Sequence, residues 1–326
     1  ENVNQSTYGR MTKWAGYHVL AKVYLNAEVY TGTEQWEKCL ETCNLIIESE
    51  KYSLSPVYKD IFSAQNEGNS EMVFAVPYDQ IYAPGFGAHM KMLLPDHRRV
   101  FDMEAQPWGG SSCNPQFIDS YDTNDNRLQD TWLMGDQLNA TDGSVVMTLT
   151  KEMPSIYNCD FTQGFRCGKY EIEAGATSSL NNDFPFLRYT DVLMMKAESL
   201  LRTGESDAAA QIVTNVRARS FDNAANALVS GDDLEGDTTV AYGTLSEDGT
   251  IDDLGDQSPV EYGRFLDELG WEFAAEARRR TDLIRFGVYQ TKNWYNHTPK
   301  GDNTIIFPIG LEELNTNTNL SQNPGY

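Results

Sequence analysis

Basic residues are scarce in this chain of 326 residues. Lys and Arg number 25 against 48 Asp and Glu, which gives a formal net charge of −23. A surface this acidic repels the phosphate backbone of nucleic acids, so nucleic acid is excluded as a partner. Long apolar runs are missing as well, and no segment is long enough to span a bilayer. The 40% of hydrophobic residues is enough for a sizeable core, and we expect one large domain.

Cysteine and histidine are also scarce, with five and four copies. There is no CxxC, and the histidines have no ligand spacing beside the cysteines, which disfavours zinc. Cys39 and Cys43 are four residues apart on an expected helix, where they share a face as buried thiols. Cys159 and Cys167 bracket a loop short enough for a disulfide. The alternative, which we favour, is that they are ordinary thiols.

Catalytic signatures are missing too. The chain has no GxSxG, HExxH, P-loop or Rossmann fingerprint. A glycoside hydrolase would need two carboxylates across a cleft, and nothing singles out one pair among the 48 acidic residues. We therefore expect a binding protein and not an enzyme, with glycoside hydrolysis as the weaker alternative.

Helical spacing is the strongest pattern that is present. Apolar and small residues recur at this spacing over residues 8–31 and, after the break TGT, from Trp36 to Ile47. Two such helices with a short turn predict an antiparallel hairpin. Residues 189–220 repeat the arrangement, and their small residues are placed as in tetratricopeptide hairpins. The pattern predicts a mainly α fold.

The segment between the two hairpins, residues 77–187, has a different character. It is rich in Gly, Pro, Asn, Asp and aromatic residues and keeps no sustained period. We interpret it as a long loop-rich insert with short strands, and irregular segments of this length are usually functional or disordered. Its many aromatic residues favour order. A helical-repeat adaptor that binds only proteins would not need such an insert.

A second irregular segment, residues 222–258, is dominated by Asp, Glu, Gly and Thr. The preferred interpretation is a solvated acidic loop. A calcium site formed by Asp232, Asp233 and Asp237 is the alternative, because carboxylate oxygens are the ligands that calcium prefers. No other cofactor is expected.

Residues 259–288 are predicted to form one further helix, and they include the arginine-rich stretch WEFAAEARRRTDLIRFG. An apolar stripe would face inward, formed by Leu266, Leu269, Phe273, Ala277 and Ile284. Carboxylates stand three or four residues from the arginines: Glu276 before Arg279 and Arg280, and Asp282 between Arg278 and Arg285. Because a phosphate site would leave its guanidinium groups free, we interpret the stretch as an ion-paired scaffold helix and not as an anion site.

The same stretch resembles the signature helix of the SusD/RagB family. The matching residues are Glu272, Glu276, Arg279, Asp282, Leu283, Arg285, Phe286 and Gly287, with Arg280 where the family usually has an aromatic and Phe286 in place of Trp. FPFLRYTDVLMMKAESLLRTGE and the closing IIFPIGLEELNTNTNLSQNPGY are similar to further family segments. GRMTKWAGYHVLAKVYL and YKDIFSAQNEGNSEMVFAVPY are similar to two upstream segments. The pieces follow family order over nearly the whole chain.

This resemblance implies one SusD-like domain with five parts. They are a helical-repeat hairpin (1–76), a ligand-binding insert (77–187), a second hairpin (188–221), the acidic loop (222–258), and the signature helix with the C-terminal segment (259–326). The family normally carries further helices and an acylated lipoprotein cysteine before the point that matches residue 1. We therefore expect the lipid anchor, and part of the scaffold, to lie outside this chain.

The resemblance also implies a function. Family members are lipid-anchored proteins on the outer face of the Gram-negative outer membrane. They bind oligosaccharides and pass them to a TonB-dependent transporter of the SusC type. Some relatives carry peptides instead, so peptide uptake is the alternative.

An aromatic platform for a sugar is expected in the insert. Trp108 precedes two glycines and can stand clear of the backbone. An exposed indole offers a flat apolar face with a polar edge, which suits stacking on a sugar ring. Tyr82, in the segment YAPGFG, and Trp132 are further candidates, although Trp132 in TWLMG is better explained as a core residue.

Three polar residues near Trp108 could supply directional hydrogen bonds to sugar hydroxyls. Asn114, Asp125 and Arg127 carry the side chains that such recognition needs. For Asp125 and Arg127 the alternative is a local ion pair at a turn.

Overall fold

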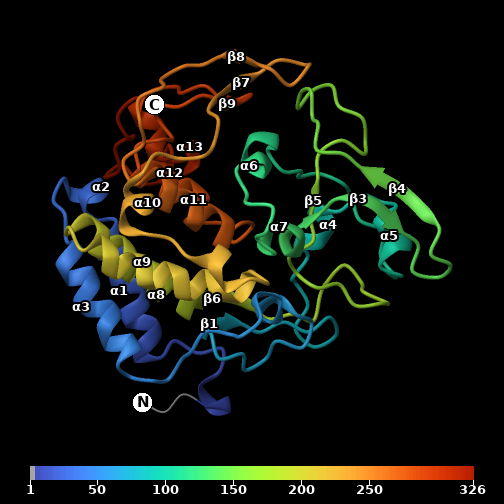
Figure 1. Ribbon diagram of the computed structural model, residues 1–326, viewed down its shortest axis with the longest axis horizontal. Helices are drawn as coiled ribbons and strands as arrows, with labels where there is room; N and C mark the ends of the chain where they lie inside the picture. The colour runs from blue at the N-terminus through green and yellow to red at the C-terminus, as the bar shows by residue number, and fades with distance from the viewer. Residues whose placement is uncertain (1–3) are drawn as a thin grey trace.

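The computed structural model describes residues 4–326 (Figure 1). Its helices are α1 (Lys13–Leu25), α2 (Ala27–Thr31), α3 (Trp36–Ile47), α4 (Ala88–Met92), α5 (His97–Val100), α6 (Pro115–Asp119), α7 (Arg127–Thr131), α8 (Tyr189–Arg202), α9 (Ser206–Arg217), α10 (Gly231–Glu235), α11 (Gly263–Glu272), α12 (Arg279–Arg285) and α13 (Leu311–Thr316). The short strands are β1 (Met72–Val76), β2 (Trp132–Leu133), β3 (Gly135–Leu138), β4 (Val145–Leu149), β5 (Arg166–Cys167), β6 (Phe184–Arg188), β7 (Gly243–Leu245), β8 (Ile251–Asp253) and β9 (Trp294–Tyr295). The mainly α fold predicted from the sequence is confirmed.

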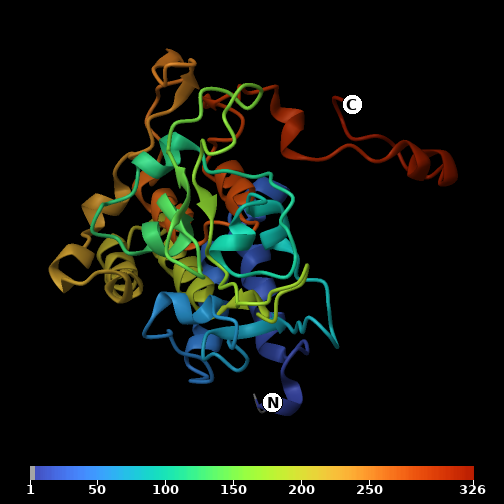
Figure 2. The same ribbon diagram turned by 90° about the vertical axis from the view of Figure 1, so that its right-hand side faces the viewer.

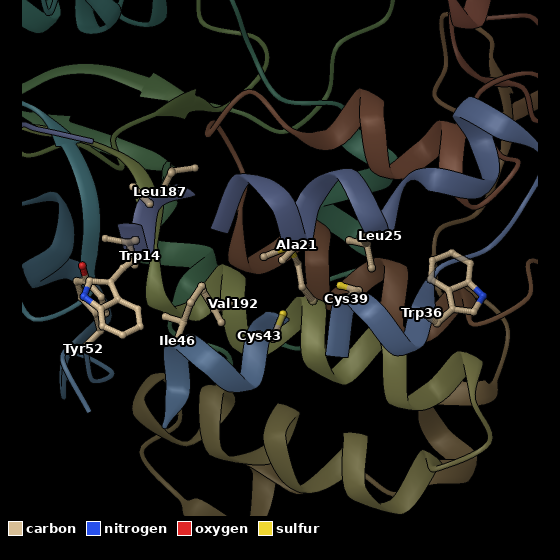
Figure 3. Close-up of a cluster of buried hydrophobic side chains, with 13 residues drawn as sticks. Trp14, Ala21, Leu25, Trp36, Cys39, Cys43, Ile46, Tyr52, Leu187 and Val192 are labelled. Atoms are coloured by element: carbon tan, nitrogen blue, oxygen red, sulfur yellow. The ribbon is translucent and has the colours of Figure 1, made fainter. Parts of the chain in front are cut away.

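The two predicted hairpins, α1–α3 and α8–α9, pack side by side (Figure 1). Small side chains at their contact, among them Ala15, Ala21, Cys39 and Cys43, are fully buried and allow the helices to approach closely (Figure 3). The next layer of the core places α8 and α9 against Phe265 and Leu269 of α11. This double hairpin is the scaffold.

The first helix differs from its prediction at its end and on its outer face. It stops at Leu25, because the side-chain amide of Asn26 donates to the carbonyl oxygen of Lys22 and ends the helix there. Val19 and Val23, which share the helical spacing of the buried residues, are more than 40% exposed. Only one face of α1 therefore packs against α3 and α8 within the described residues.

The insert leaves and rejoins the scaffold at neighbouring points. β1 pairs with β6 in antiparallel register, with Val76 opposite Phe184. Between these strands lie four short helices and two two-stranded sheets, β2–β5 and β3–β4. An aromatic core holds the insert together at its base, formed by Tyr58, Phe62, Phe86, Tyr170 and Phe184.

Residues 222–258 are only partly the solvated loop that we expected. Ala227, Leu234, Val240 and Tyr242 are buried, and α10 packs against α9 and α11. Only the β8 strand is exposed along its whole length. The apolar residues that anchor the segment are spaced widely among the acidic ones, so they form no helical or strand period in the sequence.

The three aspartates proposed as a calcium site do not form one. Asp233 caps its own helix through Ser230, and Asp237 accepts from the backbone amide of Val260. Across residues 4–326 no three His, Cys, Asp or Glu side chains gather as metal ligands. The same residues contain five free thiols, with Cys167 buried in β5 and Cys159 exposed, so the disulfide alternative is not realised.

The prediction of one helix over residues 259–288 is wrong. α11 ends at Glu272 and α12 begins at Arg279, and between them Ala275 and Ala277 have φ of 60°. Buried donors occupy the carbonyl groups that would continue the helix. Lys169 donates to the carbonyl oxygens of Glu272 and Ala274, at 3.2 and 2.9 Å. The helix breaks because these long-range hydrogen bonds replace its internal ones.

Of the ion pairs predicted within this stretch, those of Asp282 are confirmed and those of Glu276 are wrong. Asp282 pairs with Arg278 and Arg285 at 2.8 Å each. Glu276 does not pair with Arg279 or Arg280, because the break turns it inward to Arg188 and Lys169, at 2.7 and 2.6 Å. The break likewise leaves Ala277 exposed, although the rest of its predicted apolar stripe is buried.

Arg279 and Arg280 donate to backbone carbonyl oxygens, those of Leu266 and Thr304. The C-terminal segment with α13 then extends away from the body of the molecule (Figure 2). None of the helices in the described part of the chain is long and apolar enough to cross a membrane.

Candidate functional site

Three segments distant in the sequence, two of them in the insert, line an open cavity of about 610 Å³, here called the large cavity. They are residues 110–114, 153–166 and 294–300. The amide of Cys113 donates to the carbonyl oxygen of Phe165 at 3.0 Å. The amide of Ile156 donates to Oδ1 of Asn296 at 3.3 Å. These cross-loop hydrogen bonds fix the shape of the cavity.

Aromatic side chains form one wall of the large cavity. The rings of Trp294 and His297 stack with centroids 3.8 Å apart and an interplanar angle of 16°. Between them, Tyr295 adopts a φ of 47°, a left-handed conformation that side chains rarely take and that is common at functional sites. Its backbone amide donates to Oε1 of Gln116 at 2.8 Å, which ties the wall to α6.

The hydroxyl group of Tyr295 is buried and has no hydrogen-bond partner within residues 4–326. Burial raises the pKa of this phenol to about 12, so it stays a hydroxyl donor. Unsatisfied buried polar groups are rare in folded proteins and are often completed by a ligand or water. Polar side chains that could add further hydrogen bonds also line the cavity: Ser111, Ser112, Asn114, Asn296 and Thr298.

A second cavity of about 260 Å³, the small cavity, adjoins the first and shares Asn114 and Trp294 with it. The break between α11 and α12 forms one side, through Phe273, Ala274 and Ala275 among others. Tyr242 also lines this cavity, and its buried hydroxyl lies beside the side chain of Thr238. The two cavities together form a half-open site with aromatic faces and, within the described residues, one unsatisfied tyrosine hydroxyl group, that of Tyr295.

Trp108, whose side chain is 65% exposed, is not among the residues that line the large cavity, although Gly110 two residues later is. Gly109, with φ of 81°, lies against the ring of Phe161: a Cβ atom at Gly109 would be 3.9 Å from that ring, which is also exposed. Trp108 and Phe161 are thus two exposed aromatic residues next to segments that line the cavity.

Asn114 and Trp132 lie at the cavities as well. Oδ1 of Asn114 accepts from the backbone amide of Gln116 at 2.9 Å and so caps α6, and Asn114 lines both cavities. Trp132 is half-buried and lines the small cavity, so it is not the core residue that we preferred. Tyr82 lines neither cavity. It is 90% exposed on a turn held by Asp79, which accepts from its amide at 2.7 Å.

Asp125 and Arg127 lie in the interior. Arg127 is fully buried and donates to Asp125 at 2.6 Å, to Glu268 at 3.0 Å and to Glu272 at 3.2 Å. The local pair weighed as the alternative is present, and it extends into the scaffold. Because the guanidinium of Arg127 is already paired with three carboxylates, Asp125 and Arg127 join the insert to the scaffold and are not available to a ligand.

Sequence reasoning missed the aromatic wall and Arg166. The stretch KNWYNH, residues 292–297, interleaves aromatic and amide side chains, which is a usable signal for sugar recognition. Arg166 gave no signal, because its neighbours in the cavity are far from it in the sequence.

The chain is a helical-hairpin scaffold that carries a loop-rich insert over two joined cavities. Comparison with known families identifies what kind of protein this is. Residues 61–326 match the model of the SusD family, and the chain belongs to this family.

Known relatives are remote in sequence and similar in fold. The starch-binding protein SusD of Bacteroides thetaiotaomicron is 23% identical over 99% of this chain, and a SusD-like protein P25 of Formosa agariphila is 22% identical over 98%. The alignments cover only 62% and 60% of those relatives. Among solved structures, a surface glycan-binding protein A of Bacteroides thetaiotaomicron in complex with laminarihexaose has a TM-score of 0.68 at 19% identity. That match covers 99% of this chain and 66% of the other. NanU of B. fragilis has a TM-score of 0.68 at 20% identity, over 99% and 65%.

Proposed function

We propose that this protein captures oligosaccharides in the two joined cavities. The observation that carries the proposal is the unsatisfied hydroxyl of Tyr295, which lines the large cavity together with the aromatic ring of Trp294. A sugar ring offers an apolar face for the indole and hydroxyl groups for the buried donor. The exposed Trp108 and Phe161 would extend the contact along a longer chain.

The chemistry of the lining supports binding without bond cleavage. No Asp or Glu of residues 4–326 is among the residues that line either cavity. Hydrolysis of a glycosidic bond ordinarily needs two carboxyl groups across the scissile bond. Relatives described as starch-binding and glycan-binding proteins support the same choice of ligand.

We further propose delivery of the captured glycan to a TonB-dependent transporter of the SusC type. In this proposal the protein works at the outer face of the outer membrane, held there by a lipid anchor. Membership of the SusD family supports this role. Co-purification of a tagged, full-length protein with a transporter from outer membranes is the test, and a protein recovered without one would contradict it.

Calorimetric titration against plant, microbial and host polysaccharides tests capture. Tyr295→Phe is the sharpest variant, because it removes a hydroxyl that has no protein partner and keeps the ring. We expect binding of one glycan class to weaken about three- to ten-fold, the cost of one hydrogen bond. Tyr30→Ala, an exposed aromatic on α2, is the control and should bind as wild type does.

The same experiment distinguishes the alternatives. Trp108→Ala and Tyr82→Ala show which exposed aromatic extends the site, and weakening by Tyr82→Ala alone would move it away from the cavities. New reducing ends after incubation would establish hydrolysis. Binding of peptides together with silence across the glycans would replace the proposal by peptide uptake.

A further inference from the structure

Arg166 is a buried arginine without a carboxylate partner. Its side chain is 5% exposed on the wall of the large cavity. Its guanidinium donates to the backbone carbonyl oxygens of Gly110, Phe161 and Gln163, at 2.9, 3.2 and 3.3 Å. Its Nε has no partner within residues 4–326, and no Asp or Glu of this range lies within ion-pair distance.

Other buried arginines of this protein are paired with acids. At least one carboxylate lies within ion-pair distance of each of Arg127, Arg188, Arg217 and Arg285. Although burial lowers it, the charges of Asp125 and Glu268 raise the pKa of Arg127 above its usual range. For Arg217 burial outweighs the charge of Glu268, and its pKa is lowered. Burial lowers the pKa of Arg166 as well, with no carboxylate to oppose it.

The lining of the large cavity carries no acidic side chain. The chain has 48 acidic residues, yet none of those described is among the residues that line the large cavity. Arg166, Lys300 and His297 are among the residues that do. A positive cavity in a chain of net charge −23 concentrates the attraction for an anion at one place.

We infer that the large cavity selects an anionic sugar, one that bears a carboxylate or a sulfate ester, with Arg166 as its counter-charge. This inference rests on the glycan capture proposed above and names the class of glycan. A neutral sugar would leave the buried guanidinium without a counter-ion, which is costly in a site with little water. An anionic group completes it with charge-assisted hydrogen bonds, and the planar fork of arginine fits both carboxylate and sulfate oxygens.

The aromatic wall fits the same ligand. Trp294 and His297 face the cavity as a stacked pair, and the hydroxyl of Tyr295 supplies a buried neutral donor. The sugar ring would lie on this wall while its acidic group reaches Arg166 on the loop 153–166. Lys300, which is exposed, would attract the ligand from solution.

The test compares charged glycans with matched neutral ones. Oligogalacturonates and alginate oligosaccharides are titrated beside their carboxyl-reduced forms, and carrageenan oligosaccharides beside their desulfated forms. We expect one charged form to bind at least about ten-fold tighter than its neutral partner, the gain of one charge-assisted contact. Preference for the carboxylated or the sulfated member identifies the source of the anion.

Variants then assign the preference to the cavity. Arg166→Gln should remove most of the difference between charged and neutral forms, with folding checked by thermal unfolding. Lys300→Gln, at an exposed position, tests the same field without risk to the fold and should reduce the difference about two- to three-fold. Lys38→Gln, which removes an exposed charge on α3, is the matched control and should leave the difference unchanged.

The outcomes separate this inference from the proposed function. Equal or tighter binding of the neutral forms, weakened by Tyr295→Phe, would keep glycan capture and overturn the anionic preference. A preference for charged forms that survives both Arg166→Gln and Lys300→Gln would overturn the role of the cavity. Absence of binding to any glycan would overturn the proposed function and the inference with it.

Discussion

The molecule buries arginine in two different ways. At the junction between insert and scaffold, Arg127, Arg188 and Arg219 share the carboxylate of Glu272, at 3.2, 2.8 and 2.6 Å. In the large cavity, Arg166 is held by backbone carbonyl oxygens alone. In the described part of the chain, the junction pairs the charges of its arginines with carboxylates, although Nε of Arg219 has no partner, whereas the cavity leaves the charge of Arg166 without a carboxylate and the hydroxyl of Tyr295 without a partner.

This difference separates the junction, which is part of the framework, from the large cavity, which is the candidate site. An unpaired buried charge is costly, and the junction pairs its charges across segments as distant as residues 71, 127, 188 and 272. Its ion pairs therefore hold the insert in one place on the scaffold. In the lining of the large cavity, Nε of Arg166 and the hydroxyl of Tyr295 have no partner within residues 4–326.

The largest expected effect comes from breaking the junction. Glu272→Gln removes the charge that three buried arginines share, so they remain buried and incompletely paired. We expect the free energy of unfolding to fall by about 3–5 kcal/mol, measured by urea denaturation. Asp119→Asn, in the exposed pair with Lys151, is the control and should cost at most about 1 kcal/mol. Equal losses in the two variants would contradict the framework role.

The second largest loss of stability is expected at low pH, where carboxylates of the junction become protonated. Although burial raises it, the charges of Arg127, Arg264 and Arg217 bring the pKa of Glu268 down to about 2. A carboxyl whose folded pKa is depressed stabilises the fold above its unfolded pKa, and this contribution is lost as pH falls toward the folded pKa. From pH of about 4.5 to about 2, Glu268 should account for a loss of about 3 kcal/mol. Urea titrations of Glu268→Gln along this range should show a shallower pH dependence than wild type, and parallel curves would refute the assignment.

The cavity arginine should matter less to stability. Arg166→Gln loses three hydrogen bonds to carbonyl oxygens but also removes an unpaired buried charge, and these effects oppose each other. We expect a loss of about 1–2 kcal/mol in the same urea measurement, well below that of Glu272→Gln. A loss as large as that of the junction variant would show that Arg166 is framework too.

The smallest effect is expected at the unsatisfied hydroxyl. Tyr295→Phe removes no protein hydrogen bond, so the free energy of unfolding should stay within about 0.5 kcal/mol of wild type. Tyr58→Phe is the matched comparison, because its hydroxyl donates to the carbonyl oxygen of Glu272 at 3.0 Å and should cost about 1 kcal/mol. A clear loss in Tyr295→Phe would mean that this hydroxyl has a structural partner after all.

The sequence predicts the scaffold well because its signals are local. Helix α3 begins at Trp36 and ends at Ile47 as predicted, and the α8–α9 hairpin follows its small-residue pattern. The helix over residues 259–288 was mispredicted for the opposite reason. Its break depends on Lys169 and Arg188, which lie about a hundred residues away and are invisible to a local period.

The site was predictable in part. The two glycines after Trp108 predict its exposure, and Trp108 is exposed. Asn114, a polar residue of the same loop, lines both cavities. The cavity itself depends on contacts such as that between Ile156 and Asn296, 140 residues apart. The burial of Arg127 could not be predicted, because an arginine close to an aspartate has the same sequence pattern on the surface and in the core.

The separation of the large cavity from the junction has a consequence for how this protein can change over generations. None of the fifteen residues that line the cavity takes part in an ion pair of the junction. Exchange of the three loops can therefore alter the lining of the cavity while the scaffold keeps its stability. Under the proposed function, a lineage that meets a new glycan could remodel these loops step by step, and a designer could graft them in one step onto the same framework.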